Sequence, residues 1–144
     1  MKPAARHRAR RHALQALYQV LYTKEEASSV TAQHLADMNT DKVDADYFRQ
    51  LVLGVLNEIT VLDTLFSPYL DRPLADLTPI ELCVLRLATF ELKNNLEVPY
   101  RVVLNEALEL TKAFGTLEGY KFVNSILDRT SGQVRQVEYQ TRGK

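Results

Sequence analysis

Apolar residues recur at steps of three and four along most of this chain, and this spacing constrains the fold more than any other feature. An α-helix turns once in about 3.6 residues, so such steps gather apolar side chains on one side, whereas a half-buried strand needs alternation. Only the brief segment 134–139 alternates. The sequence therefore predicts an all-α fold, a compact bundle of about seven helices joined by short connections.

The first half of the chain contains three predicted helices. A weak one covers about residues 27–38, before a polar break at 39–41. A long one follows the N-cap Asp44, carries apolar residues as far as Leu62, and ends or kinks at Pro68. Residues 67–73 should form a short helical turn and a loop. The first helix buries a stripe made of Ala13, Leu14, Leu17, Val20 and Leu21.

The second half begins with the clearest local signal, a capping box from Thr78 to Glu81 with proline at the first helical position. The helix that starts there has apolar residues on more than one face, so we expect it to be central and to end near residues 94–95. Another helix follows Pro99 and stops at Gly115, and the last strong one spans about 120–129. We expect residues 1–144 to form one domain, with loose ends at 1–5 and 130–144.

Composition excludes several classes of protein. The apolar runs, such as 51–56 and 82–85, are too short to cross a bilayer, and the N-terminus lacks the apolar stretch of a signal peptide. We therefore expect a cytoplasmic protein with no membrane partner. Cys83 is the only cysteine and is flanked by apolar residues, which predicts a buried core position and no disulfide.

Signals for catalysis are weak. Glu106 and Glu109 share a helix face, but exposed acids on amphipathic helices are common and no histidine accompanies this pair. The three histidines lack metal-ligand spacing, and the five glycines form neither a P-loop nor a dinucleotide fingerprint. We therefore expect no enzymatic activity, no metal and no cofactor.

The formal net charge of zero conceals an uneven distribution of charge. Every charged residue before Glu25 is basic, and the rest of the chain holds 12 Lys and Arg against 18 Asp and Glu. This pattern predicts a basic leading helix on an acidic body. The leading basic residues are Lys2, Arg6, Arg8, Arg10, Arg11 and Lys24.

The geometry of this leading helix adds to its charge. His7, Arg11, Tyr18 and Tyr22 follow one another at steps of four, seven and four, so they share one side, with Arg8 and Gln15 beside them. Cations attract phosphates and aromatic rings can stack on unpaired bases, which favours binding of single-stranded nucleic acid. The structural alternative is a frayed basic tail whose tyrosines only edge the core.

Two further features allow a weaker functional interpretation. Glu81 is explained by the capping box, but an exposed acid at a helix start could also meet a basic protein partner. The segment from Lys121 to Asn124 opens the last main helix, where backbone amides favour phosphate, although Phe122 could be a core residue. This segment supports nucleic-acid binding only if the fold brings it beside the first helix.

Several separated motifs resemble the NusB transcription antitermination factors. A-R-R-H-A-L-Q-A-L-Y-Q from Ala9 to Gln19 is similar to the opening helix of that family, and Y-F-R-Q-L-V-L-G-V from Tyr47 to Val55 to its third. The most specific stretches are V-P-Y-R-V-V-L-N-E-A-L-E-L-T-K-A-F-G from Val98 to Gly115 and K-F-V-N-S-I-L-D from Lys121 to Asp128. The resemblance covers nearly the whole chain, with its motifs in the family's order.

This resemblance implies a fold of two small helical sub-bundles and a role in assembling antitermination complexes on ribosomal RNA transcripts. The implied partners are the boxA RNA element, the ribosomal protein NusE, RNA polymerase and the other Nus factors of the elongation complex. The NusE surface would include Glu81 and the neighbourhood of Phe114. The RNA surface would draw on Arg6, His7, Arg8, Arg10, Arg11 and Tyr18, and on Glu118, Lys121, Phe122 and Asn124.

The chain departs from the family pattern near the second of these RNA regions. Glu118 and Gly119 stand where the family often has Asp-Ser before the K-F-V-N motif, and Ser125 stands where a glycine commonly follows the asparagine. The longer side chain of Glu118 is therefore expected to alter how this region meets RNA.

Two other functions compete with an RNA-binding adaptor. A protein-only interaction module would dock the basic helix on an acidic surface and would not protect RNA from nuclease. An RNA-modifying enzyme is suggested by the occurrence of NusB-like domains fused to RNA methyltransferases, but this chain has no room for the glycine-rich cofactor domain.

Overall fold

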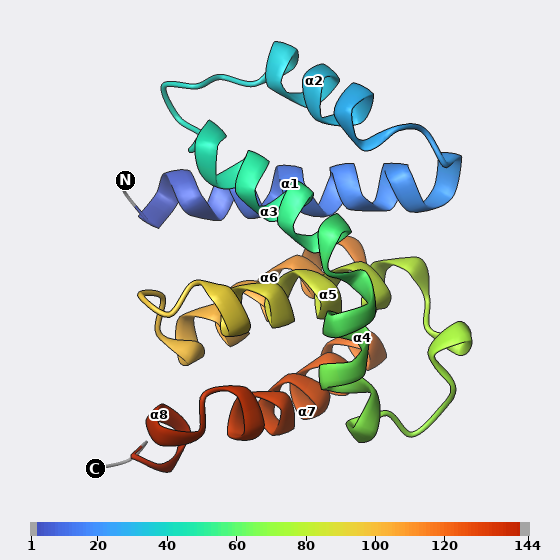
Figure 1. Ribbon diagram of the computed structural model, residues 1–144, viewed down its shortest axis with the longest axis vertical. Coiled ribbons are helices and arrows are strands. Elements are labelled where there is room, and N and C mark those ends of the chain that lie inside the picture. Colours follow the sequence, from blue (N-terminus) through green and yellow to red (C-terminus); the bar gives the residue numbers. More distant parts are fainter. Residues whose placement is uncertain (1–2, 142–144) are drawn as a thin grey trace. The chain divides into compact units, whose positions relative to one another are not determined.

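The computed structural model describes residues 3–141, and every regular element in that stretch is helical. It contains eight α-helices and two short 3₁₀ helices, and no strand occurs between residues 3 and 141 (Figure 1). The all-α class predicted from the apolar spacing is confirmed. The alternating segment 134–139 is divided between the end of one helix and the beginning of the next.

The chain divides into two compact units, of which the first ends at Asn57 and the second begins at Glu58. The first unit contains α1 (Pro3–Thr23), α2 (Ala27–Asp37) and α3 (Ala45–Asn57). All three helices contact one another, and Figure 1 shows α2 lying alongside α1. The core of this unit contains Leu14, Leu17, Val30, Phe48, Leu51 and Val52.

Short connections join these three helices, and specific residues mark where the helices end and begin. Lys24 follows α1 with a left-handed φ of 60°, which turns the chain away from the helix axis. Asp44 acts as the N-cap of α3, because its Oδ1 accepts a hydrogen bond from the Tyr47 amide at 3.1 Å. The limits predicted for the weak second helix agree with α2 to within one residue.

The prediction of one long helix ending at Pro68 is wrong, because the helix breaks at Glu58. Glu58 has φ −120° and ψ 18°, and α4 (Ile59–Phe66) starts immediately after it. The Glu58 carboxylate accepts hydrogen bonds from Lys93 at 2.7 Å and from Asn94 at 3.3 Å. These contacts with a distant segment favour the break, which no glycine or proline marks in the sequence.

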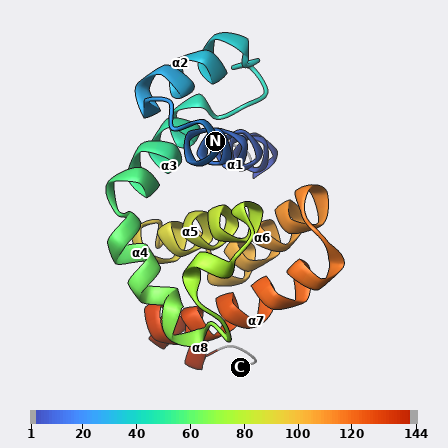
Figure 2. The same ribbon diagram turned by 90° about the vertical axis from the view of Figure 1, so that its right-hand side faces the viewer.

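The second unit is arranged around a central helix. That helix, α5 (Pro79–Asn94), contacts α4, α6 (Tyr100–Phe114) and α7 (Leu117–Val134). Figure 2 shows α4 against α5 and α7. Buried side chains project from several sides of α5, as its sequence predicts, and include Cys83. After α4 the elements are η1 (Ser67–Tyr69), η2 (Leu74–Asp76), α5 (Pro79–Asn94), α6 (Tyr100–Phe114), α7 (Leu117–Val134) and α8 (Gln136–Gln140).

The ends of α5 and α6 lie where the sequence predicts them. Thr78 Oγ1 accepts from the Glu81 amide at 3.2 Å, and Glu81 Oε1 accepts from the Thr78 amide at 3.1 Å, which completes the capping box. α5 ends at Asn94. Gly115 follows α6, and its amide donates to the Thr111 carbonyl at 2.7 Å.

The two ends that were expected to be loose are helical where the structure describes them. α1 already begins at Pro3, and Ala5 is buried. Helical structure continues through α7 and α8 to Gln140, whereas the sequence predicted a last helix ending near residue 129. Residues 1–2 and 142–144 lie outside the described part of the chain. The C-terminal residues buried beyond residue 129 are Thr130, Ser131 and Arg135.

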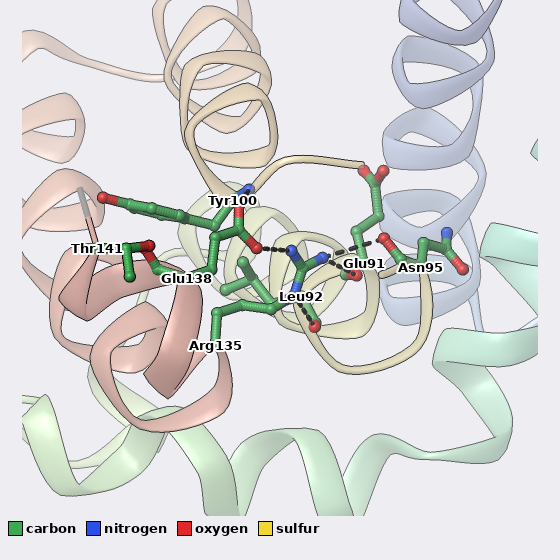
Figure 3. A network of polar contacts seen from close by, with 7 residues as sticks. All are labelled: Glu91, Leu92, Asn95, Tyr100, Arg135, Glu138 and Thr141. Atoms are coloured by element: carbon green, nitrogen blue, oxygen red, sulfur yellow. Dashed lines mark hydrogen bonds and ion pairs between the residues drawn. The ribbon is translucent and has the colours of Figure 1, made fainter. Parts of the chain in front are cut away.

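A buried guanidinium group accounts for the order of this C-terminal segment. Arg135 Nε donates to the Leu92 carbonyl at 2.6 Å, and its Nη2 donates to the carbonyls of Asn95 at 3.0 Å and Glu91 at 3.3 Å. Figure 3 shows these bonds converging at the end of α5, together with the ion pair between Arg135 and Glu138. The chain after residue 129 is thereby tied to the core of the second unit.

No single helix within residues 3–141 combines the length and the apolar composition needed to cross a membrane. α3 and the segment 59–69 pass such a test only when they are joined across their break, and then by length and composition alone. Most apolar residues of α3 are core residues of the first unit, among them Phe48 and Leu51, whereas Leu53 is exposed.

Candidate nucleic-acid interface

The basic helix α1 has one buried side and one exposed side. Leu14 and Leu17 tie it to the core of the first unit, and Ala9, Ala13 and Ala16 are also buried. Because these residues fix the rotation of the helix, the side chains on its other side project in a fixed register. The exposed residues of that side include Arg8, Arg11, Gln15 and Tyr22.

Two tyrosines form an aromatic platform at the far end of this exposed side. The rings of Tyr18 and Tyr22 are stacked, with centroids 5.9 Å apart and planes inclined by only 6°. Tyr22 is 74% exposed, and Tyr18 is half-buried. The four-residue step in the sequence correctly predicts that these side chains are neighbours.

The arginines of α1 divide into two groups. Arg8 and Arg11 are exposed, and Arg8 Nη1 donates to the Lys42 carbonyl at 3.3 Å. By contrast, Arg6 and Arg10 both lie over the Tyr47 ring, at 4.2 and 5.4 Å from its centroid. These two cations are the less exposed pair.

Arg10 is the member of the predicted RNA surface that fits its assigned place least well. Its side chain is only 3% exposed, because it lies over the Tyr47 ring on the side of α1 that carries the buried alanines. This burial argues against the predicted contact of Arg10 with phosphate. Arg6 is half-buried and lies 3.9 Å from the Asp44 carboxylate, and His7 is also half-buried.

The second predicted set lies on the first turns of α7. Glu118, Lys121 and Asn124 are exposed, whereas Phe122 is half-buried. The helix begins at Leu117, earlier than predicted, so Lys121 stands in its second turn. The backbone amides that could meet an anion are therefore those of residues 117 and 118 and not those of 121–124, which corrects the prediction, and the Gly119 amide donates to Thr116 Oγ1 at 3.0 Å.

The predicted residues on α7 also have neighbours that the sequence does not predict. Arg72 lies over the Phe122 ring at 4.4 Å from its centroid, and Lys112 lies over the Tyr120 ring at 4.8 Å. Each pair brings a cation beside an aromatic ring in this region. The contact of Arg72 with Phe122 joins residues 50 positions apart, and no local pattern in the sequence could have revealed it.

Glu81 and Phe114 were predicted to face a protein partner. Glu81 is not the exposed acid that was expected, because it is only 9% exposed and one carboxylate oxygen is bound to the Thr78 amide. Its other oxygen borders Gly119, where an added Cβ would lie 3.2 Å away. Phe114 is half-buried at the end of α6.

The two predicted RNA-binding sets belong to different units. The residues predicted on α1 lie in the first unit, and those predicted on α7 lie in the second. Within residues 3–141, no group of three or more His, Cys, Asp or Glu side chains is placed to hold a metal ion. Burial raises the pKa of the Cys83 thiol to about 11, so this thiol stays protonated near neutral pH.

Comparison with known proteins gives one consistent result. The profile of the NusB family matches residues 7–131. The transcription antitermination protein NusB of Idiomarina loihiensis is 50% identical over 129 residues, which cover 90% of this chain and 93% of that protein. Its counterpart in Marinobacter nauticus is 47% identical over 141 residues, covering 98% and 89%.

Structural similarity extends over the same range. The solved structure of T. maritima NusB matches with a TM-score of 0.84 at 28% sequence identity, covering 97% of this chain and 99% of that one. Sequence profile, relatives and fold therefore agree over nearly the full length. The chain belongs to the NusB family, and it is a non-enzymatic transcription antitermination factor.

Proposed function

We propose that this antitermination factor is an RNA-binding adaptor that acts on ribosomal RNA operons, where it binds a boxA-like single-stranded RNA together with the ribosomal protein NusE. The observation that carries the proposal is the exposed side of α1, on which Arg8 and Arg11 precede the stacked pair Tyr18 and Tyr22. A helix fixed by its buried side presents these groups without the entropic cost of ordering a loose arm.

The chemistry of these side chains suits an unpaired strand. Guanidinium groups bind phosphate in a bidentate manner, and each neutralised phosphate makes the affinity dependent on salt. Tyrosine rings stack on bases that are not buried in a duplex. We assign Arg8 and Arg11 to phosphates and Tyr18 to a base, while Arg6 and Arg10 hold α1 against Tyr47.

We assign a second part of the RNA surface to the beginning of α7. Lys121 and Asn124 are exposed there and offer a cation and an amide, and Phe122 lies under the guanidinium of Arg72. Glu118 adds a negative charge to this region, so it would restrict the contact to groups that can donate hydrogen bonds to it.

The protein partner is assigned to the surface around Phe114 and Leu117. Leu117 is 72% exposed beside the half-buried Phe114, which is a suitable apolar contact for a second protein. Glu81 would act on this surface indirectly, by holding the beginning of α5 against Gly119. Through NusE and the RNA, the adaptor would join the cytoplasmic elongation complex with RNA polymerase and the other Nus factors.

The experiment that tests RNA binding is a titration of fluorescent boxA-like RNA at several salt concentrations. Replacing Arg11→Gln should weaken binding and reduce the slope of log affinity against log salt by about 0.7, the value for one phosphate contact on a single strand. Arg49→Gln is the matched control, because Arg49 is an exposed arginine of α3 that pairs with Asp46. This control should keep the wild-type slope.

The same titration repeated with NusE tests the adaptor role. If the two partners bind cooperatively, each should raise the affinity for the other by the same factor. A salt-independent affinity, or a slope unchanged by Arg11→Gln, would contradict RNA binding through α1. Tight binding of NusE without protection of RNA from nuclease would instead support a protein-only module.

A further inference from the structure

The first unit contains a polar pocket of about 200 Å³ to which the proposed RNA and NusE contacts assign no role. Three residues of α1 and three of α2 line it, all of them polar. A pocket lined by mixed donors and acceptors suits a neutral, hydrogen-bonding ligand more than an apolar one. The lining residues are His12, Gln15 and Gln19 from α1 and Gln33, His34 and Asp37 from α2.

Gln19 fixes the hydrogen-bonding roles of its neighbours. Its amide nitrogen donates to the Glu25 carboxylate and to the Gln33 side-chain oxygen, both at 3.2 Å. Its carbonyl oxygen can only accept, so the Nε2 of His34, 3.3 Å away, carries the proton. A neutral His34 then has Nδ1 as an acceptor, and the Gln33 side chain contributes its amide hydrogens as donors.

His12 adds a polar atom that the fold itself does not satisfy. Its Nδ1 is buried and has no hydrogen-bond partner among the described residues. The ring stands edge-on to His34, with centroids 6.1 Å apart, and edge-on to Phe48, at 6.2 Å. A buried polar atom without a partner is costly, so the fold carries an unsatisfied group in the wall of this pocket.

The charge of the pocket excludes an anionic ligand. Burial lowers the pKa of His12, and Arg11 lowers it further. Burial and then His12 lower the pKa of His34, against a smaller opposing effect of Asp37. Both rings are therefore neutral near pH 7, and of the six lining residues only Asp37 carries a charge. A phosphate would meet a carboxylate there, whereas an amino group would meet an acceptor.

The position of the pocket on α1 indicates where such a ligand comes from. Gln15 follows Arg11 by four residues and precedes Tyr18 by three, so the pocket opens beside the proposed path of the RNA. Four residues of helix span about 6 Å along the axis, a distance that one nucleotide can bridge. A strand whose phosphate is held by Arg11 could therefore place a neighbouring base at the pocket.

We propose that the pocket between α1 and α2 takes one unstacked nucleobase that bears an exocyclic amino group, from the RNA strand held by Arg8 and Arg11. The amino group donates to the Asp37 carboxylate, and an acceptor on the base receives the Gln33 amide. Uracil lacks the amino group and is disfavoured. This inference rests on the proposed RNA binding and adds a base-selective subsite to it.

Scanning the RNA position by position tests the subsite. In a fluorescent boxA-like RNA, each nucleotide is replaced in turn by an abasic site and, separately, by uridine. For the wild-type protein, one amino-bearing position should lose about tenfold in affinity with either replacement. Asp37→Asn and Gln33→Ala should each remove most of this loss. Asp41→Asn is the matched control, because it makes the same charge change at an exposed residue just beyond α2.

The outcomes separate this inference from the function on which it rests. Suppose that the wild type binds RNA with an Arg11-dependent salt slope, but that no position shows the loss or both pocket variants retain it. The subsite is then overturned while RNA binding stands. Absence of RNA binding by the wild type would overturn both. Circular dichroism checks the fold of each variant, and Gln33→Ala decides the matter if Asp37→Asn is unfolded.

Discussion

Arg135 shows how much of the second unit depends on one side chain. It is 5% exposed, and its guanidinium donates to the carbonyls of Leu92, Glu91 and Asn95 at the C-terminal end of α5. The Glu91 and Asn95 carbonyls also accept from backbone amides, whereas the Leu92 carbonyl relies on the guanidinium. Its ion-pair partner Glu138 also accepts from the Tyr100 amide at 2.7 Å, at the first residue of α6. One ion pair therefore satisfies the end of one helix and the beginning of the next.

Replacing Arg135→Met should lower the free energy of unfolding by about 3 kcal/mol, because it removes the guanidinium donor from the buried Leu92 carbonyl and the cation from Glu138. Urea denaturation followed by far-ultraviolet circular dichroism measures the loss. Arg129→Met is the matched control, since Arg129 is an exposed arginine of α7, six residues before Arg135, and it should change stability by less than about 0.5 kcal/mol. Equal losses in the two variants would contradict the role given to Arg135.

The sequence predicted which kinds of residue make up the candidate site, but it predicted only part of their exposure to solvent. The exposed side of α1 follows from the sequence, and Arg8, Arg11 and Tyr22 lie on it. Arg10 was placed on the same surface by the family resemblance, although its spacing of three and four from Ala13 and Leu14 puts it on the buried side. For Arg10, the position in the helical period predicts burial correctly, whereas the positive charge alone suggests exposure.

At the scale of elements, helix boundaries were predicted correctly where a local sequence signal marks the start or the end of a helix. The capping box at Thr78 and the glycine after α6 each mark a boundary that the structure has. The break at Glu58 and the helices beyond residue 129 were missed, because contacts with Lys93 and with the end of α5 favour them. Such long-range contacts leave no mark in the local sequence.

Two glycines of the second unit should respond to alanine in opposite directions. At Gly115 an added Cβ would lie 2.9 Å from the Thr111 backbone oxygen, so Gly115→Ala should destabilise by about 1–2 kcal/mol. Gly132 lies within α7, where the Cβ would meet the Tyr139 ring at 3.4 Å, an ordinary contact. Gly132→Ala should stabilise by about 0.5–1 kcal/mol through helix propensity. Thermal denaturation compares the two, and a shift of both midpoints in one direction would refute the assignment.

At the scale of the whole molecule, the two units contain different groups that titrate in acid. His12 and His34 lie in the first unit, with pKa values below 6.5 because of burial. Glu138 lies in the second. Burial opposes its ionisation, but the Tyr100 amide and Arg135 outweigh burial and hold its pKa below 4.5. Acidification therefore acts on the two units over separate ranges of pH.

The first unit should lose stability at a higher pH than the second. A histidine that is harder to protonate in the fold stabilises fully above pH 6.5, and its contribution is lost as the pH falls from there toward its lowered pKa. The contribution of Glu138 persists down to pH 4.5 and is lost below it. Hydrogen exchange corrected for its intrinsic pH dependence should show α2 losing protection first. His34→Gln should reduce that early loss, and simultaneous loss in both units would contradict the prediction.

The family resemblance implies two helical sub-bundles and the structure has two compact units, but the position of the boundary between them could not be predicted. Apolar spacing suffices for an all-α fold, and motifs spread over the chain suffice for the family. The boundary at Asn57 and Glu58 falls inside a segment whose apolar period runs on without interruption. Only the pattern of contacts between distant residues separates the units, and that pattern depends on packing.

The bonds of Arg135 also impose an order of events on biosynthesis. Leu92 is synthesised 43 residues before Arg135, and Asn95 is synthesised 40 residues before it. The carbonyls of both residues therefore leave the ribosome before the guanidinium that binds them. At a synthesis rate of about 5–20 residues per second, they wait about 2–8 seconds for it. By then all three helices of the first unit have emerged, so that unit can mature while the end of α5 is still waiting. A nascent chain that stalls between these two points would expose an incomplete second unit to chaperones and proteases.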